Sequence, residues 1–429
     1  MLIEFTVGNF RSFKDKQTFS LEAVGNLASP ESISLLEDAN QTLLPSAVIY
    51  GANASGKTNL ILALNFMRNF VINSSAKGRR DGPIPYTPFR LNPANSEIPS
   101  YFEIVFITDG VRYRYGFEMD SSQVISEWLY RRKIREVSLF KREKGKMRVN
   151  AGFKEGLGLE RRTRSNALYL SVVAQFNGEI AGIVTKWYRR NLKIFSALIR
   201  PHYTNTTIDI MKKHDDIAQF IKNVIYNFDT GIDDIIIKDS LRGARFEEEE
   251  SQEPEIMEPG PSWSDQYEVV TKHYLYNDEN EIVGSVNFDM IADESDGTER
   301  LFDLIGPILY ALVVGATLVV DEFENRLHPL LLYSLIRLFN SDVTNNKNAQ
   351  IIITTHNHSL LDQNLFRKDQ IWLTEKRSNG ASNLFSLSEY KFPTGSKVRS
   401  DSNFGVDYLK GKYGAIPFID NIEDIFLRK

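Results

Sequence analysis

The stretch GANASGKT, residues 51–58, decides how this chain is read. It follows the apolar run AVIY, residues 47–50, which predicts a buried strand, and it precedes residues 59–66, which predict a helix. A strand, a glycine-rich loop and a helix in this order direct backbone N–H groups and the positive end of the helix dipole at one anion. Lys57 can then reach the β- and γ-phosphates, and the Thr58 hydroxyl can join the shell of a Mg²⁺ ion. We therefore expect a nucleoside triphosphate to bind here.

Composition narrows the protein class. The chain has 429 residues, enough for one large domain or two to three ordinary ones, and its six histidines and lack of cysteine exclude disulfides, thiolate metal sites and a cysteine nucleophile. The first residues alternate like a strand, so we expect no signal peptide. The longest apolar stretch, residues 305–320, is interrupted by Gly306, Pro307 and Gly315, which favours a helix and a buried strand over a membrane span. We expect a soluble, cytoplasmic protein with no membrane partner.

Two segments of opposite charge stand out against the net charge of −5. Residues 131–164 carry 13 Lys or Arg and 4 Asp or Glu, whereas residues 246–265 carry 8 acids and no Lys or Arg. The simpler interpretation is a solvated strand pair and a flexible acidic loop. The alternative is that the basic segment, with Phe140 and Phe153 interleaved, touches nucleic acid or an acidic partner.

Periodicity divides the rest of the chain. Residues 1–23 suggest a hairpin, and strands are expected over 101–107, 111–118 and 123–131, the first two joined by a Thr-Asp-Gly turn. Between about 165 and 226 the apolar spacing becomes helical, and strands resume at 267–275 and 282–290. The helical stripes consist of Leu168, Val172, Val173 and Phe176, then Ile180, Ile183, Val184, Trp187 and Ile194. We expect a mixed or antiparallel sheet beside the nucleotide-binding core, followed by a helical insertion.

The second half of the nucleotide site is predicted from two further strands. ATLVVDE, residues 316–322, is an apolar strand ending in two acids, which suits Asp321 to the Mg²⁺ shell and Glu322 to activation of the attacking water. QIIITTH, residues 350–356, is another buried strand, and it ends at His356. Because parallel strands end at the same edge of such a sheet, we expect His356 near the γ-phosphate.

A third polar element is ESDGTER, residues 294–300, immediately before an amphipathic segment. It can be an ordinary helix N-cap, but a serine hydroxyl and a glycine at a helix N-terminus also form a phosphate-binding edge. One chain does not need a second such edge for one nucleotide. Two chains do, if each lends its Ser-x-Gly edge to the other's phosphate loop.

Together these motifs resemble the Walker A, signature, Walker B and switch-histidine motifs of ABC-type ATPases. The opening NFRSF, residues 9–13, and the Gly-x-Asn form of the phosphate loop resemble the SMC/RecF-like branch, whose members act on DNA. DEFENRLHP (321–329), residues 166–177 and YLKGKYGAIP (408–417) look like the compact AAA ATPases of bacterial anti-phage abortive-infection systems, the RloA/AbiL-like group. The resemblance covers nearly the whole chain.

The resemblance assigns roles position by position. Ser295 and Gly297 would contact the γ-phosphate of the opposite subunit, and Glu324 and Asn325 would lie in the loop that crosses the dimer interface. Gln175 is a candidate Mg²⁺-sensing glutamine, while Arg11 and Ser12 are expected to approach the nucleotide. The expected catalytic residues are Glu322, His356 and Lys57. The residues expected to bind the nucleotide are Gly51, Asn53, Ser55, Gly56, Lys57, Thr58, Asn59, Arg11, Ser12, Ser295 and Gly297. The expected magnesium residues are Thr58, Asp321 and Gln175.

Two departures from the relatives qualify this comparison. SMC-like proteins carry long coiled coils between the two halves of the head, and here only about 100 residues of short helices and loop stand there. Relatives of the OLD type carry a C-terminal Toprim nuclease, but only 73 residues follow His356 (429 − 356), without a convincing acidic Toprim pattern. We expect the nuclease, if there is one, to be another protein.

These expectations define an α/β fold: a P-loop NTPase core like an ABC/SMC head, with an N-terminal mixed or antiparallel β-subdomain and an inserted helical subdomain. The expected parts are a lobe at 1–160, a helical insertion at 161–240, an acidic disordered loop at 241–266 and a second lobe at 267–429. The leading hypothesis is an ATP- and Mg²⁺-dependent clamp, a homodimer or higher homo-oligomer, that controls an effector such as a Toprim-like nuclease in anti-phage defence. The alternatives are a DNA-repair ATPase that grips duplex DNA through the basic segment and a scaffold that binds but does not hydrolyse nucleotide.

Overall fold

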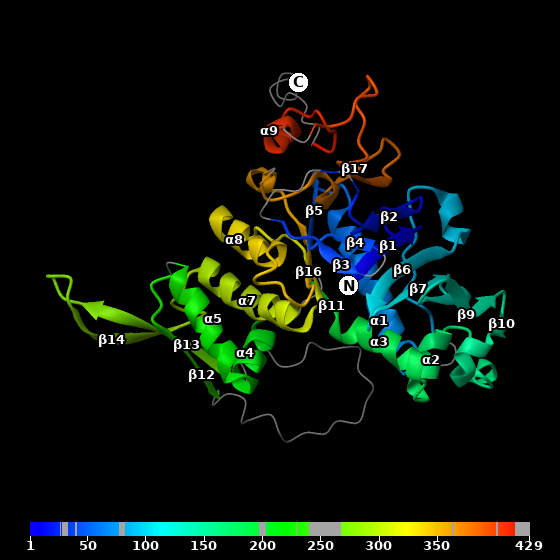
Figure 1. Ribbon diagram of the computed structural model, residues 1–429, viewed down its shortest axis with the longest axis horizontal. Coiled ribbons are helices and arrows are strands. Elements are labelled where there is room, and N and C mark those ends of the chain that lie inside the picture. Colours follow the sequence, from blue (N-terminus) through cyan, green and yellow to red (C-terminus); the bar gives the residue numbers. More distant parts are fainter. Residues whose placement is uncertain are drawn as a thin grey trace, which may run out of the picture. The chain divides into compact units, whose positions relative to one another are not determined.

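The computed structural model describes residues 1–25, 27, 33–38, 41–76, 82–196, 203–228, 230–239, 267–362, 364–399 and 402–416. The chain divides into two compact units (Figure 1). Unit 1 contains residues 1–199, 311–323 and 333–429, and unit 2 contains residues 200–310 and 324–332. The predicted acidic loop at 241–266 lies outside the described residues.

An antiparallel sheet of seven strands opens unit 1, in the order β10-β9-β8-β7-β6-β1-β2. Its strands are β1 (Leu2–Gly8), β2 (Gln17–Ser20), β6 (Ser100–Thr108), β7 (Val111–Met119), β8 (Val124–Arg132), β9 (Glu136–Glu143) and β10 (Lys146–Val149). Positive φ angles at Asp109 (51°) and Gly110 (68°) let β6 and β7 join through a tight turn. The hairpins predicted at the N-terminus and at residues 101–118 are therefore present.

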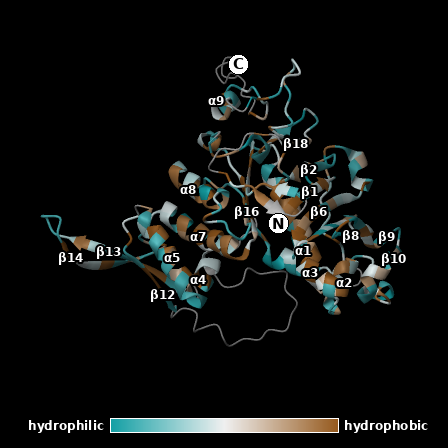
Figure 2. Ribbon diagram, in the orientation of Figure 1, coloured by the Kyte–Doolittle hydropathy of each residue, from teal (hydrophilic) through white to brown (hydrophobic). Residues whose placement is uncertain are grey.

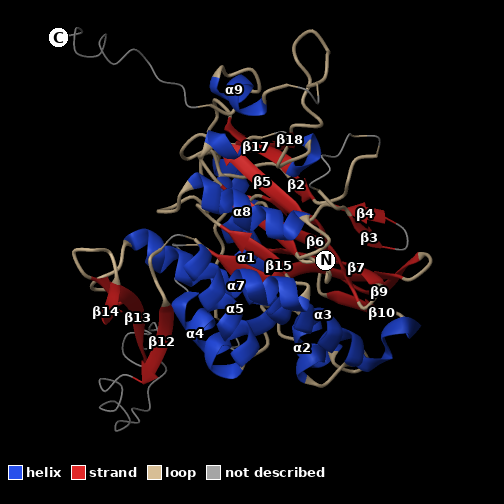
Figure 3. Ribbon diagram, turned by 60° about the vertical axis from the view of Figure 1, so that its left-hand side comes forward, coloured by secondary structure: helices blue, strands red, loops and turns tan. Residues whose placement is uncertain are grey.

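A second sheet of six strands carries the nucleotide motifs of unit 1, in the order β11-β15-β16-β5-β17-β18. Figure 3 labels four of these strands, β5, β15, β17 and β18. Its strands are β5 (Ser46–Gly51), β11 (Leu192–Phe195), β15 (Thr317–Val320), β16 (Gln350–Thr354), β17 (Ile371–Lys376) and β18 (Ser382–Ser386). All neighbours pair in parallel except β17 and β18. Consequently the carboxyl ends of β11, β15, β16 and β5 lie at one edge, as expected for a P-loop core.

The helix α1 (Lys57–Asn73) joins the two sheets of unit 1 into one core. It contacts β1 of the first sheet and β5 and β11 of the second. One cluster of buried residues runs from β1 and β6 through α1 to β15 and β16, and Figure 2 shows apolar residues gathered along α1. The predicted α/β P-loop core is confirmed.

Two short helices, α2 (Tyr169–Gln175) and α3 (Glu179–Arg190), cover this core. Val173, Val184 and Trp187 lie in the same buried cluster as α1, so these helices belong to unit 1, and its division from unit 2 falls at residue 199 and not at 160. The predicted helical stripe extends too far, because Ile194 lies on strand β11 and pairs with Val319 of β15. Pairing with a parallel strand overrides the helical spacing there.

Unit 2 combines helices with a small antiparallel sheet in the order β12-β13-β14. Its elements are α4 (Tyr203–Lys213), α5 (Asp215–Asn227), β12 (Asp234–Asp239), β13 (Tyr267–Tyr276) and β14 (Ile282–Asp289). Both α7 (Asp296–Val314) and α8 (Pro329–Asn340) begin in unit 2 and end in unit 1. Thr207 of α4 donates a hydrogen bond of 2.9 Å to the Phe302 carbonyl, and a Cβ at Gly306 would lie 2.4 Å from the Thr207 hydroxyl. Gly306 thus lets α4 approach α7.

The remaining described elements are small. They are β3 (Leu36–Asp38), β4 (Gln41–Leu43), α9 (Phe404–Leu409) and the 3₁₀ helices Pro93–Glu97, Ala151–Gly156, Glu160–Arg162, His358–Leu360 and Lys368–Gln370. None of the helices in the described part of the chain has the length and apolar character required to cross a membrane. The segment expected as a helix and a strand at 305–320 is the second half of α7 followed by β15.

Candidate nucleotide-binding site

The phosphate loop joins β5, which ends at Gly51, to α1, which begins at Lys57. The Lys57 ammonium donates to the carbonyls of Gly51 (2.8 Å) and Ala52 (3.1 Å), and it lies 3.4 Å from Nδ1 of His356. The Lys57 side chain is buried, whereas Asn53 is exposed at the tip of the loop. The fold therefore brings the predicted Lys57 and His356 together beside a loop that faces outward at its tip.

Side chains of β17 and β18 fix the shape of this loop. The Ser55 and Thr374 hydroxyl oxygens are 2.6 Å apart, and the Ser382 hydroxyl donates to the Ser55 carbonyl at 2.5 Å. Gly56 has a φ of 121°, and a Cβ there would lie 2.4 Å from the Ser382 hydroxyl. Glycine is therefore required at position 56 for two reasons, backbone conformation and space. The sequence did not single out Thr374 or Ser382.

Asp321 lies at the carboxyl end of β15 and accepts hydrogen bonds from three neighbouring segments. Its Oδ1 accepts from the hydroxyls of Thr354 (2.5 Å) and Thr58 (3.4 Å), and its Oδ2 accepts from Ser196 (3.1 Å). The carboxylate is buried. Thr58 and Asp321, the two residues predicted for the Mg²⁺ shell, are thus adjacent, while Ser196 and Thr354 were not predicted.

Glu322 follows with a different environment. Its side chain is exposed, its φ is 51°, and its N–H donates to the Thr354 hydroxyl at 2.9 Å. A non-glycine residue in the left-handed region costs about 1–3 kcal/mol, so the surrounding bonds must hold it there. The next residue, Phe323, donates its N–H to the Thr354 carbonyl at 3.0 Å. Thr354 therefore holds both the buried Asp321 and the turn that presents Glu322.

Residues of the N-terminal hairpin also reach the loop. The Ser12 hydroxyl accepts from the Asn59 amide at 2.8 Å, and the Ser12 carbonyl accepts from the Ser382 N–H at 2.7 Å. Arg11 is exposed with a φ of 50°, and its guanidinium lies 5.8 Å from the Phe10 ring centroid. The fold brings the predicted Ser12 and Asn59 to the phosphate loop.

The segment near the C-terminus supports the same loop. The Ala415 carbonyl accepts from the Ala52 N–H at 3.0 Å and from the Tyr408 hydroxyl at 3.2 Å. The Tyr50 ring packs 5.8 Å from that of Tyr408, and its hydroxyl donates to the Asn357 carbonyl at 3.0 Å, beside His356. The stretch 408–417 was noted in the sequence only as a family resemblance.

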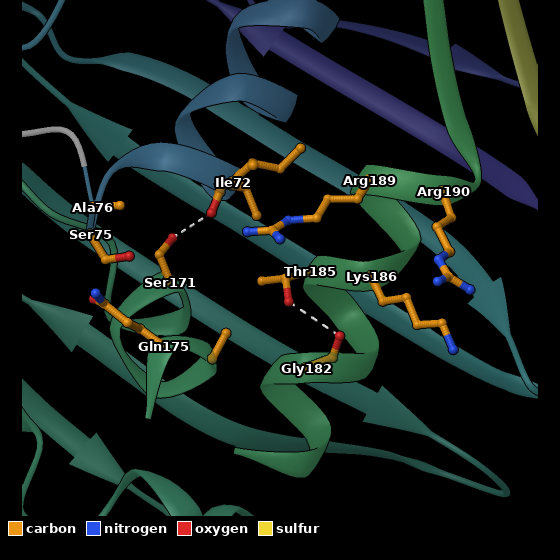
Figure 4. A pocket seen from close by; sticks show the side chains of 12 residues that line it. Ile72, Ser75, Ala76, Ser171, Gln175, Gly182, Thr185, Lys186, Arg189 and Arg190 are labelled. Carbon is orange, nitrogen blue, oxygen red and sulfur yellow. Dashed lines mark hydrogen bonds between the residues drawn. The ribbon is translucent and has the colours of Figure 1, made fainter. Parts of the chain in front are cut away.

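The predicted magnesium residue Gln175 does not join this group. It ends α2 and lines a cavity of about 380 Å³ with Val71 and Ile72, at the carboxyl end of α1 (Figure 4). Thr58 is at the opposite end of this 17-residue helix, which at about 1.5 Å per residue is roughly 25 Å long. The charged side chains lining the cavity are Lys186, Arg189 and Arg190. Cations repel a divalent metal, so this surrounding does not suit magnesium.

Two further cations, Arg68 and Lys193, lie close to Arg189 and Arg190 of that cavity. Burial and the charges of Arg68 and Arg190 lower the pKa of Lys193 to about 8. Burial and the charge of Arg189 likewise lower the pKa of Arg68, which donates to the carbonyls of Tyr188 and Leu192 at 3.0 Å. Arg68 thus satisfies one carbonyl group in the last turn of α3 and one at the start of β11.

The predicted second phosphate-binding edge lies in unit 2. Ser295 is exposed, and its hydroxyl accepts from the Thr298 N–H at 3.1 Å, which makes it the N-cap of α7. A Cβ at Gly297 would lie 2.9 Å from the Arg326 carbonyl, so glycine allows the loop at 324–326 to pack closely. Arg326 also forms an exposed ion pair with Asp296 at 3.2 Å.

The basic segment 131–164 is only partly available to a nucleic acid. Phe140 and Phe153, the aromatic residues interleaved in this segment, are fully buried in the core of unit 1 and are therefore not available to contact a nucleic acid or an acidic partner. Arg142 is buried and donates to the Ala167 carbonyl at 2.8 Å, and Arg164 donates to the Ser74 carbonyl at 3.0 Å. The exposed cations of the segment are Arg132, Lys133, Arg135, Lys144, Lys146, Arg148, Lys154, Arg161 and Arg162.

The residues at the strand edge fit a nucleotide-bound Mg²⁺. Among the described residues no three His, Asp or Glu side chains form a group that could hold a metal ion. Magnesium in nucleotide sites needs only one or two protein oxygens beside the phosphates, and it retains water in its shell. The Thr58 hydroxyl and the Asp321 carboxylate supply those oxygens, and the bound metal would draw negative charge from the phosphates.

A strand, a phosphate loop and a helix, together with a carboxylate at the same edge of the sheet, define a P-loop nucleotide-binding protein. Residues 46–362 match the family described as "AAA domain, putative AbiEii toxin, Type IV TA system", and the chain belongs to this family. The matched range begins with β5 and includes the Ser295 edge, Asp321 and His356. The resemblance to AAA-type ATPases drawn from the motifs is therefore confirmed.

Solved structures similar to the chain include SMC head domains. One is the SMC head bound to the C-winged helix domain of ScpA, with 13% identity, a TM-score of 0.44 and coverage of 90% of this chain and 97% of that chain. Another is the SMC head domain from Thermotoga maritima, with 13% identity, a TM-score of 0.38 and coverage of 90% of this chain and 98% of that one. No curated protein matched the sequence.

Proposed function

We propose that this protein binds and hydrolyses ATP with Mg²⁺ and acts as a molecular clamp. The observation that carries this proposal is the convergence of Lys57, Thr58, Asp321, Glu322 and His356 on one sheet edge from separate segments of the sequence. Lys57 would bind the β- and γ-phosphates, while Thr58 and Asp321 would hold the metal. The exposed Glu322 carboxylate would take the proton of the attacking water, and His356 would orient the γ-phosphate.

The clamp requires two chains that share two nucleotides. Ser295 and Gly297 would bind the γ-phosphate held by the opposite subunit, a role supported by their position at the N-terminus of α7, where Ser295 is exposed and Gly297 half-buried. Binding energy from both nucleotides would favour the closed dimer, and hydrolysis would release it. The half-buried Glu324 and the exposed Asn325, in the loop after Glu322, are expected at the same interface.

The partner we propose is an effector protein in trans, of a nuclease-like kind such as a Toprim protein, in bacterial anti-phage defence. The support is the resemblance to abortive-infection ATPases and the family description, which names an AbiEii toxin and a toxin–antitoxin system. The ATPase would then switch the effector by a population shift between open and closed states, in the cytoplasm.

The test is the mass in solution of Glu322→Gln with and without Mg-ATP, measured by light scattering. The variant removes the base but keeps its shape, so the closed state should accumulate and the mass should double. Adding Ser295→Arg places a bulky cation at the shared edge and should abolish the doubling without changing nucleotide binding to the monomer. An unchanged mass with bound ATP would refute ATP-driven dimerisation.

A second candidate function, direct binding of duplex DNA, is favoured by the exposed cations Arg132, Lys133, Arg161 and Arg162. Phosphate contacts release counterions, so such binding should weaken steeply with salt. Reversing these four charges should abolish binding of a random-sequence duplex by the isolated protein. If the unmodified protein shows no binding at low salt, this candidate is excluded.

A further inference from the structure

Glu294 immediately precedes the exposed Ser295 but has the opposite environment. Its side chain is 7% exposed, and Oε1 lies 2.7 Å from Nε2 of His273 and accepts a hydrogen bond from the Thr271 hydroxyl. Thr271 and His273 are two residues apart on β13, so their side chains point to the same face of that strand. A carboxylate and the strand are therefore joined by two contacts at a single oxygen.

The partners of Glu294 are themselves held in place. Thr271 is fully buried, and its hydroxyl lies 3.5 Å from the Phe288 carbonyl on β14. The His273 ring packs against the Phe288 ring, with centroids 4.7 Å apart. The Glu294 carboxylate thus contacts residues whose positions are set by the three-stranded sheet of unit 2.

Backbone bonds between the sheet and the Ser295 turn are few. The Met290 N–H donates to the Val269 carbonyl, and the Asp293 N–H donates to the Asp289 carbonyl, each at 3.0 Å. From Ser295 onwards the bonds run into α7, because the Glu299 N–H donates to the Ser295 carbonyl. The Asp293 carboxylate accepts from the Asp289 N–H on β14 at 2.7 Å, and the Glu294 side chain that follows it links the start of α7 back to β13.

Burying a carboxylate is costly unless it is paired and hydrogen-bonded. The neighbouring Asp296 is bonded quite differently, in an ion pair with Arg326 whose side chains are 69% and 53% exposed. Exposed pairs of that kind contribute little to stability. Of the two acids that flank Ser295, only Glu294 is positioned to restrain the turn.

We propose that Glu294 is a positioning residue that ties the Ser295–Gly297 edge to β13, so that the placement of the β12–β14 sheet sets the orientation of this edge. The consequence for catalysis rests on the proposed function, in which Ser295 and Gly297 bind the nucleotide of the opposite subunit. The anchoring itself does not, because all its contacts lie within unit 2. A movement of the sheet would regulate turnover without touching the phosphate loop.

The deciding experiment measures amide hydrogen exchange of residues 293–299 in the full chain without nucleotide. Glu294→Ala removes both contacts, and we expect exchange in this segment to rise about tenfold or more. Glu294→Gln keeps an oxygen that accepts from Thr271 and His273, so exchange should stay close to that of the unmodified protein. Lys272→Ala is the matched control, since Lys272 lies between Thr271 and His273 on β13 and pairs with Asp233 at 3.4 Å.

Turnover measurements then test the functional consequence. Glu294→Ala should lower kcat about tenfold while leaving the KM for ATP and the binding of ATP to the monomer unchanged, and Glu294→Gln should restore kcat. Unchanged exchange in Glu294→Ala, or equal increases in the Ala and Gln variants, would overturn the anchoring. Altered exchange with unaltered kcat would overturn the catalytic role. Absence of turnover in the unmodified protein would instead refute the proposed function, and the exchange data would still decide on the anchor.

Discussion

Replacing Thr354 by valine tests whether one hydroxyl organises the catalytic edge. The substitution keeps the branched shape on a buried strand and removes only the oxygen. Two bonds are lost, the 2.5 Å bond to Asp321 Oδ1 and the 2.9 Å bond from the Glu322 N–H. Asp321 would retain Ser196 at 3.1 Å and the long contact with Thr58 at 3.4 Å.

The size of the effect follows from these two bonds. A hydrogen bond to a charged group contributes about 1.5–3 kcal/mol, and an N–H left without a partner costs about 1–3 kcal/mol. Unit 1 should therefore lose roughly 2.5–6 kcal/mol of stability. If the bond to Asp321 serves only to orient its carboxylate, a loss of 1.5–3 kcal/mol corresponds to a fall in kcat of about 10- to 150-fold.

The assay is steady-state ATP hydrolysis combined with denaturant unfolding, using Thr317→Val as the control. Thr317 is also buried, and it is the first residue of β15, at the opposite end of that strand from Asp321. Its hydroxyl donates to Gln350 Oε1 at 3.0 Å. The control should lose stability but keep kcat, because it touches no residue of the catalytic edge. A kcat for Thr354→Val within twofold of the unmodified protein would refute the role assigned to Thr354.

Three further predictions concern single residues. Gly56→Ala should abolish ATP binding measured by calorimetry, since the strained backbone alone costs about 1–3 kcal/mol and the Cβ would lie 2.4 Å from the Ser382 hydroxyl; retained affinity would contradict this. Burial raises the pKa of Asp303 from 3.8 to about 6, so the folded state binds this proton more tightly than the unfolded state does. The contribution of Asp303 to the free energy of unfolding therefore falls as the pH rises from about 4 to 6, and it does not return at higher pH. Asp303→Asn should remove that dependence and stabilise unit 2 at pH 7 by up to about 3 kcal/mol in urea unfolding, and equal stability at pH 7 would exclude it. Glu127→Ala should lower the free energy of unfolding by about 3–5 kcal/mol in the same assay. The substitution removes the carboxylate that lies 4.0 Å from the buried Arg142 and that accepts hydrogen bonds from the N–H groups of Tyr169 and Leu170. A loss below about 1 kcal/mol would contradict this prediction.

The sequence predicted the parts of the site that follow from local pattern. Lys57 and Thr58 were placed by a loop whose glycines and flanking elements are contiguous, and Asp321 and His356 by apolar runs that end in polar residues. The parallel pairing of β15, β16 and β5 then brings those strand ends to one edge without further information. The roles assigned to these residues remain predictions.

Other parts could not be predicted because they depend on pairing between distant segments. Ser382 reaches the loop only because β18 pairs with β17, and Ser196 reaches Asp321 only because residues 192–195 form a strand beside β15. Nothing in the spacing of hydroxyl residues distinguishes these from other serines. Gln175 shows the converse case, since the family resemblance suggested a magnesium role for a residue that lies at the far end of α1 from Thr58.

The bonds that hold the phosphate loop and those that hold the Ser295 edge involve different residues. The loop at 51–58 is bonded to Thr374, Ser382 and Ala415, and Ser12 is bonded to Asn59 immediately after it. The Ser295 edge is held by Glu294, Thr271 and His273, all within unit 2. The two sets share no residue, so under the proposed anchoring role of Glu294 a change at the second edge would not require these bonds of the phosphate loop to break. Such a separation suits a switch whose nucleotide affinity stays constant while its turnover is regulated.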